Sequence, residues 1–415
     1  MRIGEIRHPE RQTWGKPLED VRVLAVEQMQ ALPYATQLMA HLGADVVKVE
    51  PPGRGDSGRA SQPALTDEDG RRVGATYLRN NLSKRSLALD LTKPEGRTLF
   101  ERLVPHFDVV AENYKAGAME RLGLGYDAVA KLAPKVIYAS VSGFGHDGSP
   151  YADWPAYAPI AEAMAGLYEP NRRPGQPPPV VVAGALGDIG SALFSVIGIL
   201  SALRQRERTG LGQHVDVALY DAMVAISDMP PFLWSMGLGP EYAAAGRFGI
   251  CSAFRASDGW FVVAVFREHQ FERLARAVGH PEWCREERFA TREGWAAHID
   301  AVIRPALEGW AADKTRLEAC GELCALGIAA GPSNRPEDLA ADPHLADRSM
   351  LVEVPRPDAE RPMQVVGNPV KLSRVAEGPV RPPPRLGEHG DEVLRGILEL
   401  GDEEIAALRR EGVIG

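Results

Sequence analysis

Short apolar strands that alternate with helical stretches are the feature that most constrains the fold of this chain. Val23–Glu27 and Asp45–Glu50 are predicted strands, and Tyr34–Leu42 between them is a predicted helix that Gly43 ends. The same order continues with a strand at Ser86–Leu91, a helix at Pro94–His106, and strands at Asp108–Ala111 and Val136–Val141. Strands of this kind, alternating with helices, build a parallel sheet that is covered on both faces. We therefore predict an α/β fold.

The pattern changes near residue 225, and this change predicts a second, smaller domain. Trp260–Phe266 is a predicted strand and Gln270–Val278 a predicted helix. Val354–Arg385 is rich in proline, so we expect a stiff, extended spacer without core elements there. The predicted parts are a large domain at 1–225, a small domain at 226–335, a linker at 336–385 that returns to the large domain, and C-terminal helices of the large domain at 386–415.

Charge and cysteine content exclude several classes of protein. The 415 residues carry a net charge of −9, which argues against a nucleic-acid partner. Four cysteines are too few for a disulfide framework, and Cys320 and Cys324 have no second Cys/His pair at a suitable spacing, so no metal site is predicted. The first residues lack the apolar stretch of a signal peptide. We expect a soluble, cytoplasmic protein.

A single carboxylate in an apolar stretch is the main candidate for chemistry. Asp188 is the only charged residue between Val180 and Leu203, and glycines surround it. We predict a short strand, a turn and a buried helix here, because an isolated carboxylate within a membrane would be costly. A helix N-terminus favours a carboxylate, and glycines let a ligand approach the backbone. By position alone, the role of a helix N-cap is the more common one for such an aspartate.

Other motifs are weak or missing. The first strand is followed by Gln28–Pro33, which contains no glycine, so the dinucleotide-binding fingerprint is missing. No nucleophile elbow, P-loop or H-E-x-x-H pattern occurs. His146 is interpreted as a solvated turn residue. Glu112–Gly117, with Arg121 nearby, follows the end of a strand and offers an amide, an aromatic ring and a cation. That set suits a nucleotide-like ligand with phosphates, although an ordinary polar loop explains it equally well.

Several stretches, taken together and in order, resemble the class III coenzyme A transferases, which include formyl-CoA:oxalate and carnitine CoA-transferases. They are Pro33–Gly53 with Gly55–Asp56, Asn81–Ser86 with Leu89–Leu91, Glu112–Gly117 with Arg121–Gly125, Tyr138–Gly145, Gly187–Asp188, Thr209–Gln213 with Asp216–Asp221, and Leu386–Leu394. The resemblance implies a Rossmann-like large domain built from both chain ends, a smaller inserted α+β domain, and an interlocked homodimer.

The resemblance also implies a mechanism in which Asp188 is the nucleophile. Its carboxylate would attack an acyl-CoA, and the released CoA would then form a thioester with Asp188, which an incoming carboxylic acid reverses. Coenzyme A would be substrate and carrier, with no permanently bound cofactor and no metal. The family's binding residues carry over to these positions: Gln30 and Ala31 beside the thioester, Leu89 to Thr92, Asn113, Tyr114, Lys115 and Arg121 on CoA, and Tyr157 near the reacting group.

There are three departures from the family pattern and two alternative interpretations. The glycine-rich loop of the oxalate branch has no clear counterpart near residue 250, so oxalate is not the expected acceptor. Pro51 replaces an arginine that contacts CoA in the formyl-CoA branch, and Leu32 replaces a common glycine, which is expected to change the acyl pocket. One alternative is an isomerase like the 2-methylacyl-CoA racemases, whose histidine aligns with Tyr157 or Ala158 here. The other is a non-catalytic acyl-CoA-binding protein. The sequence does not identify the donor and acceptor acids.

Overall fold

The computed structural model describes residues 1–67, 70–146, 148–173, 175–181, 184–238, 249–356 and 359–415. The chain divides into two compact units, each of which is described by itself. The larger unit contains Met1–Tyr168, Val180–Ser227 and Pro343–Gly415, and the smaller unit contains Glu169–Pro179 and Asp228–Asp342.

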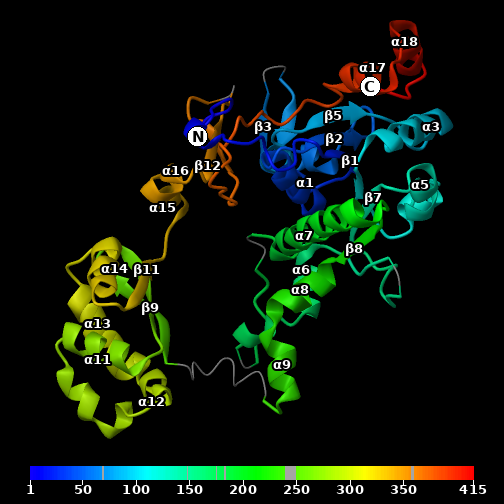
Figure 1. The fold of residues 1–415 in the computed structure, drawn as a ribbon. Helices are drawn as coiled ribbons and strands as arrows, with labels where there is room; N and C mark the ends of the chain where they lie inside the picture. The colour runs from blue at the N-terminus through cyan, green and yellow to red at the C-terminus, as the bar shows by residue number, and fades with distance from the viewer. Residues whose placement is uncertain (68–69, 147, 174, 182–183, 239–248, 357–358) are drawn as a thin grey trace. The chain divides into compact units, whose positions relative to one another are not determined.

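A six-stranded parallel sheet forms the centre of the larger unit (Figure 1), which confirms the predicted α/β fold. Its order is β5 (Arg85–Ala88), β2 (Asp45–Glu50), β1 (Arg22–Val26), β6 (Val109–Glu112), β7 (Ile137–Ser142) and β8 (His214–Ala218). The chain runs outward from β1 to β2 and β5, and then returns to place β6 on the other side of β1. Strand order therefore reverses between β1 and β6. Open α/β sheets bind ligands at such a point, beyond the carboxyl ends of the strands.

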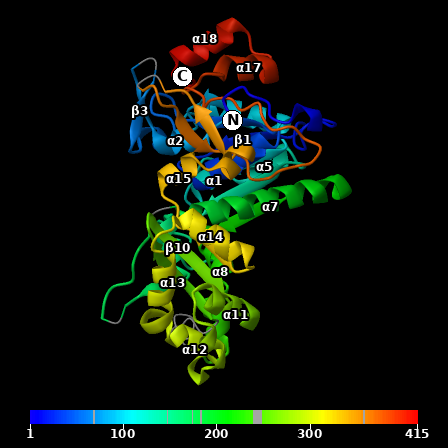
Figure 2. The ribbon, with the colours of Figure 1, turned by 90° about the vertical axis from the view of Figure 1, so that its left-hand side faces the viewer.

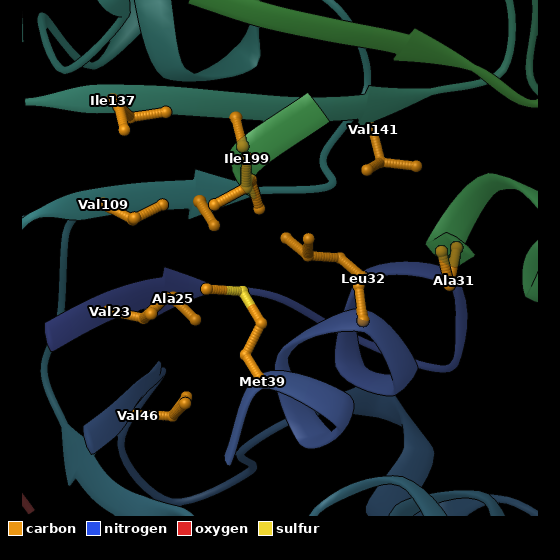
Figure 3. Close-up of a cluster of buried hydrophobic side chains, with 14 of the residues drawn as sticks. Val23, Ala25, Ala31, Leu32, Met39, Val46, Val109, Ile137, Val141 and Ile199 are labelled. Carbon is orange, nitrogen blue, oxygen red and sulfur yellow. The ribbon is translucent and has the colours of Figure 1, made fainter. Parts of the chain in front are cut away.

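Helices cover both faces of this sheet. One face packs against α1 (Ala31–His41), α6 (Ala158–Met164), α7 (Leu186–Thr209) and α8 (Leu219–Ser227). The other packs against α3 (Pro94–Leu103), α5 (Tyr126–Leu132), α17 (Gly390–Leu398) and α18 (Asp402–Arg410). Successive residues of β1 alternate between the two cores, with Val23 on the first face and Leu24 on the second. Figure 3 shows the first core, where Met39 of α1 reaches toward Ala25 of β1.

The C-terminal part of the chain returns to the larger unit and folds there. In both views α17 and α18 lie next to each other at the chain end (Figure 1; Figure 2). The hairpin of β12 (Leu351–Val354) and β13 (Met363–Val366) buries Val352 and Val365 against Leu82 and Val380. The expected spacer without core elements is therefore wrong. Proline restricts the chain to extended conformations that strands also adopt, and the valines decide the burial.

Shorter elements complete the larger unit. They are β3 (Ala64–Thr66), β4 (Arg72–Gly74), α2 (Ala75–Asn80), α4 (Ala118–Arg121) and α16 (Pro343–Asp347).

The smaller unit has its own core. An antiparallel sheet in the order β11 (Ala329–Pro332), β10 (Gly259–Val265), β9 (Ile250–Ala256) packs with helices around buried aromatic side chains. The predicted strand and helix correspond to β10 and α11 within two residues. The helices of this unit are α9 (Met229–Ser235), α11 (Glu268–Ala277), α12 (Arg292–Ala297), α13 (Arg304–Ala311), α14 (Arg316–Ala325) and α15 (Pro336–Ala340).

By length and apolar composition alone, α7 could span a membrane. Of its most apolar 18-residue window, 44% is buried within the structure, and the core helix of a globular protein meets the same criteria. The helix packs against α1, α6, α8 and β7. Leu193 and Ile197 on its outer side are 45% and 58% exposed, so the helix is half-buried and not buried as predicted. The strand predicted before it falls partly on residues 182–183, outside the described residues.

Buried charged side chains lie beneath the loops that follow β1 and β2. Lys84 Nζ lies 2.6 Å from Glu27 Oε1, and Lys48 Nζ lies 2.8 Å from Asp56 Oδ2; all four side chains are fully buried. Lys84 also donates to the carbonyl of Pro33 at 2.8 Å. Burial lowers the pKa of Lys84 to about 8, although the charge of Glu27 opposes this. Each charge in this network depends on its partner, because an unpaired buried ion is strongly unfavourable.

We predict that Lys84→Met destabilises the protein, because it leaves Glu27 buried with a weaker partner. The expected loss is about 3 kcal/mol of unfolding free energy, measured by urea denaturation followed by circular dichroism. Lys131→Met is the matched control, since Lys131 is exposed on α5, and it should change stability by less than about 0.5 kcal/mol. Equal effects of the two substitutions would show that the buried pair has no special role.

Candidate active site

The loops after β1 and β6 are joined across the point where the strand order reverses. The Gln28 N–H donates to Asn113 Oδ1 at 2.8 Å, and Asn113 Nδ2 donates to the Gln28 carbonyl at 2.9 Å. The next residue, Met29, has a left-handed φ of 63°, and its N–H donates to Asp56 Oδ1 at 2.9 Å. Asp56 belongs to the buried charge network, so that network holds the loop from below.

A cavity of about 320 Å³ opens at this place in the larger unit. Its walls come from the loops after β1, β6 and β7 and from the start of α7. Seven residues predicted from the sequence line it together: Gln30, Ala31, Asn113, Tyr114, Lys115, Tyr157 and Asp188. Three others, Leu89, Thr92 and Arg121, are not among the lining residues.

Asp188 lies in the first turn of α7 and is one of the residues that line the cavity. The helix begins at Leu186, after Gly184 and Ala185 with positive φ values of 96° and 40°. Ala185 is therefore the N-cap residue, and the alternative in which Asp188 caps the helix is wrong. Among the described residues, none donates a hydrogen bond to the Asp188 carboxylate. The side chain is thus partly buried and open to a ligand.

Close packing of α6 on α7 brings a second carboxylate to the nucleophile candidate. A Cβ atom on Gly187 would lie 2.9 Å from the Cα of Ala158, so only glycine permits this approach. The Gly187 N–H donates to Glu162 Oε1 at 2.8 Å, and the Tyr168 hydroxyl donates to Glu162 Oε2. Glu162 is buried, with 3% of its surface exposed.

The electrostatic surroundings make the Asp188 carboxylate less stable than an exposed one. Burial, followed by the charge of Glu162, raises the pKa of Asp188 to about 6, and Arg79 acts in the opposite direction. Arg79 also donates a hydrogen bond to Gln30 Oε1. Sequence reasoning missed both Glu162 and Arg79. The signal for Glu162 was present, because it is the single charged residue in α6.

The remaining binding candidates lie in different surroundings. The Lys115 side chain is half-exposed at the cavity, with its Nζ 3.7 Å from Asp153 Oδ1. Tyr157 is 72% exposed. Thr92 is exposed, and both its N–H and its hydroxyl donate to Asp90 Oδ1. Arg121 ends α4 and is exposed outside the lining.

The side chains of Leu89 and Leu32 both lie in the protein core. Leu89 is 1% exposed, its N–H donates to the Glu50 carbonyl at 2.8 Å, and its side chain belongs to the core of one sheet face; its contact with CoA stays a prediction. Leu32 is fully buried and packs into the opposite core, as Figure 3 shows. Leu32 is not among the residues that line the cavity, whereas the neighbouring Ala31 is.

The interpretation of His146 as a solvated residue is wrong. Its side chain is 8% exposed, with Nε2 3.2 Å from Glu112 Oε1 and Nδ1 3.2 Å from Asp216 Oδ1. Burial lowers the pKa of His146, but the hydrogen bonds to Asp216 and Glu112 outweigh it and raise the pKa to about 10. Glu112 Oε2 accepts the N–H of Tyr114 at 2.9 Å. The charged imidazole therefore holds the loop that carries Tyr114.

Comparison with known proteins connects this site to an established family. The model of CoA-transferase family III matches residues 18–390. The chain is 37% identical over 388 residues to the succinyl-CoA:mesaconate CoA-transferase of Haloarcula marismortui, covering 91% of this chain and 95% of that protein. It is 34% identical over 412 residues to the succinyl-CoA–D-citramalate CoA-transferase of Chloroflexus aurantiacus, with 96% and 98% covered. The crystal structure of a CAIB/BAIF family protein from Brucella suis matches with a TM-score of 0.80 and 33% identity, covering 92% of this chain and all of that one.

We predict that Asp188→Asn stabilises the folded protein at neutral pH. The folded-state pKa of about 6 exceeds the ordinary 3.8, so ionisation of Asp188 destabilises the fold. The penalty is complete above the folded pKa and vanishes below the unfolded one. Urea denaturation should therefore show a gain of about 2 kcal/mol at pH 7.5 and almost none at pH 3.5.

Asp153→Asn is the control for this measurement, because the Asp153 side chain is 98% exposed. It should change stability little at either pH. A gain for Asp188→Asn that is the same at both pH values would contradict the destabilised carboxylate.

Proposed function

The chain belongs to CoA-transferase family III, and we propose that it exchanges coenzyme A between carboxylic acids through a covalent thioester on Asp188. The observation that carries this proposal is the Asp188 carboxylate, which lines the cavity without a hydrogen-bond partner among the described residues. Its raised pKa of about 6 leaves it mostly ionised at pH 7 and more basic than an exposed aspartate. A carboxylate in this state is suited to nucleophilic attack.

The transfer proceeds through two acyl-transfer steps on Asp188, which the acceptor acid then reverses. An Asp188 oxygen attacks the thioester carbonyl of the donor, the carbon–sulfur bond breaks, and CoA leaves as a thiolate while a mixed anhydride remains. The thiolate then attacks the aspartyl carbonyl, and the donor acid leaves as a carboxylate. The acceptor acid reverses both steps and regenerates the free carboxylate. Because α1 begins at Ala31 in the cavity wall, its N-terminal dipole favours the negative charge that develops on the oxygens.

The loop after β6 is the proposed binding place for CoA. Asn113, Tyr114 and Lys115 line the cavity, and the half-exposed Lys115 ammonium suits a phosphate of the nucleotide. Arg121 and Thr92, which are exposed beyond the lining, are proposed to hold more distant parts of the nucleotide. CoA would act as substrate and carrier, with no permanently bound cofactor.

We propose dicarboxylic acids as the substrate class. The curated relatives compared above are named for succinyl-CoA together with mesaconate or citramalate. The guanidinium of Arg79 supports this assignment, since it bonds Gln30 in the cavity wall, acts electrostatically on Asp188, and forms no ion pair with an acidic side chain of the described residues. Succinyl-CoA is therefore the first donor to test.

The geometry favours transfer over racemisation. A racemase needs a histidine opposite the aspartate across the α-carbon, and the lining residues of the cavity include no histidine. Tyr157 occupies the position that aligns with the racemase histidine. His146 does not replace that histidine, because its ring is held between Glu112 and Asp216. The family membership likewise favours an enzyme over a non-catalytic binding protein.

The proposal extends to an interlocked homodimer of two-domain chains that works in the cytoplasm. The outer side of α7 supports association, because it carries Leu193, Phe194, Ile197 and Leu200 with 37–58% of their surfaces exposed in a single chain. Sedimentation equilibrium should give twice the mass of one chain.

We predict that Asp188→Ala abolishes exchange between succinyl-CoA and a panel of carboxylic acids. The rate should fall at least about 10⁴-fold, because Asp188 is the only carboxylate among the described residues that line the cavity. Intact-mass spectrometry of wild-type enzyme with succinyl-CoA should show an added CoA that hydroxylamine removes. The variant should show no adduct while it still binds CoA.

Turnover retained by Asp188→Ala would rule out this mechanism. Solvent deuterium in the α-carbon of a 2-methylacyl-CoA would support the racemase instead. Tight CoA binding by wild-type protein without any adduct would support the binding protein.

A further inference from the structure

Glu162 is a buried carboxylate without a cationic partner among the described residues. It lies on α6 with 3% of its surface exposed, and among the described residues no Lys, Arg or His is within ion-pair distance of it. Its two oxygens accept hydrogen bonds from the Gly187 N–H and the Tyr168 hydroxyl. Acceptance at both oxygens suits the ionised carboxylate, which has no proton to donate. A buried charge without an opposite charge beside it lowers the stability of the fold, and this cost suggests that the charge has a function.

We propose that Glu162 is a positioning residue of the transfer reaction, whose charge destabilises the free Asp188 carboxylate relative to its acylated forms. This inference rests on the proposed function, in which Asp188 carries CoA. The hydrogen bond from the Gly187 N–H places the negative charge one residue before the nucleophile.

Two charged groups act on Asp188, and they come from different helices. Glu162 on α6 raises its pKa together with burial, and Arg79 on α2 lowers it. Among the described residues, the other elements that pack on α7 add no further charge that acts on Asp188. Their titratable side chains are Tyr34 and His41 on α1, Tyr138 on β7, His214 and Asp216 on β8, and Tyr220 and Asp221 on α8.

Repulsion between the two carboxylates changes during the reaction. Before attack, Asp188 and Glu162 are both negative. In the mixed anhydride Asp188 is neutral and the negative charge lies on the CoA thiolate. In the aspartyl-CoA thioester Asp188 is again neutral, and the negative charge has left with the donor acid. The repulsion therefore raises the free energy of the resting enzyme and not of the covalent intermediates. A difference of this kind between the two states favours the covalent form.

The same carboxylate fixes the geometry of the attack. Gly187 is held between the backbone of α6 and Glu162, because a Cβ there would meet Ala158 at 2.9 Å and the N–H is bound at 2.8 Å. The first turn of α7 is thereby held in place, and Asp188 with it. A neutral amide at position 162 can keep this bond and remove only the charge.

Glu162→Gln tests the charge in the full-length enzyme. The acidic limb of the pH profile of kcat/KM for succinyl-CoA should move to lower pH by about 0.5 to 1 unit. The ratio of CoA-carrying to free enzyme, at a fixed ratio of succinyl-CoA to succinate, should fall about 3- to 10-fold, which corresponds to the same shift. Intact-mass spectrometry after an acid quench measures this ratio.

Tyr168→Phe is the matched variant, because it removes a hydrogen bond to Glu162 and keeps the charge. Without the hydroxyl dipole the carboxylate is less well compensated, so the acidic limb should stay in place or move to higher pH. Opposite behaviour of the two variants supports the proposal. This comparison also tests the charge if Glu162→Gln folds poorly, since a downward shift in Tyr168→Phe would overturn the proposal.

The outcomes separate this inference from the proposed function. If wild-type enzyme forms the CoA adduct but Glu162→Gln leaves both the acidic limb and the adduct fraction unchanged, Glu162 has a structural role only. If both variants lose activity equally without any shift of the limb, the charge is likewise not involved. Absence of the adduct in wild-type enzyme would instead reject the mechanism on Asp188.

Discussion

The pairing of buried charges beneath the β1 and β2 loops is the interaction on which the rest of the site depends. Glu27, Lys84, Lys48 and Asp56 are fully buried, and each is tolerable only because an opposite charge lies beside it. Asp56 also accepts a hydrogen bond from the N–H of Met29, and so connects the buried charges to the loop after β1. The loop after β1 therefore keeps one conformation, and the cavity wall that it forms is in place before any ligand binds.

The opposite side of the cavity is held by a second set of charges. His146 lies between carboxylates on β6 and β8, and one of these, Glu112, binds the backbone of the next loop through its other oxygen. Together the two networks fix the loops on both sides of the strand reversal. The proposed mechanism on Asp188 needs such rigidity, because a long, flexible substrate would have to bring its thioester within bonding distance of that carboxylate.

Asp188 differs from these charges because no described residue forms an ion pair or a hydrogen bond with its carboxylate, and only the more distant charge of Arg79 stabilises it. Its burial and the neighbouring Glu162 both disfavour ionisation. The site thus gives up some folding stability at a single group, while the paired charges around it supply the stability of the scaffold. A destabilised carboxylate is the one expected to gain most from becoming an acyl carrier, which connects the electrostatics of the fold to its reaction.

The sequence by itself determined the parallel sheet, the helix that carries Asp188 and the position of that aspartate, because strand periodicity and glycine-flanked turns are local properties. It also indicated the family. The tertiary structure decided which side chains meet: Leu89 faces the core, His146 lies between carboxylates, and Glu162 from another helix binds the backbone of Gly187, next to Asp188. Some of these contacts join residues that are far apart in the chain. Others depend on the direction of a side chain or on how two helices pack. No local pattern encodes such distances, so only the folded chain could establish them.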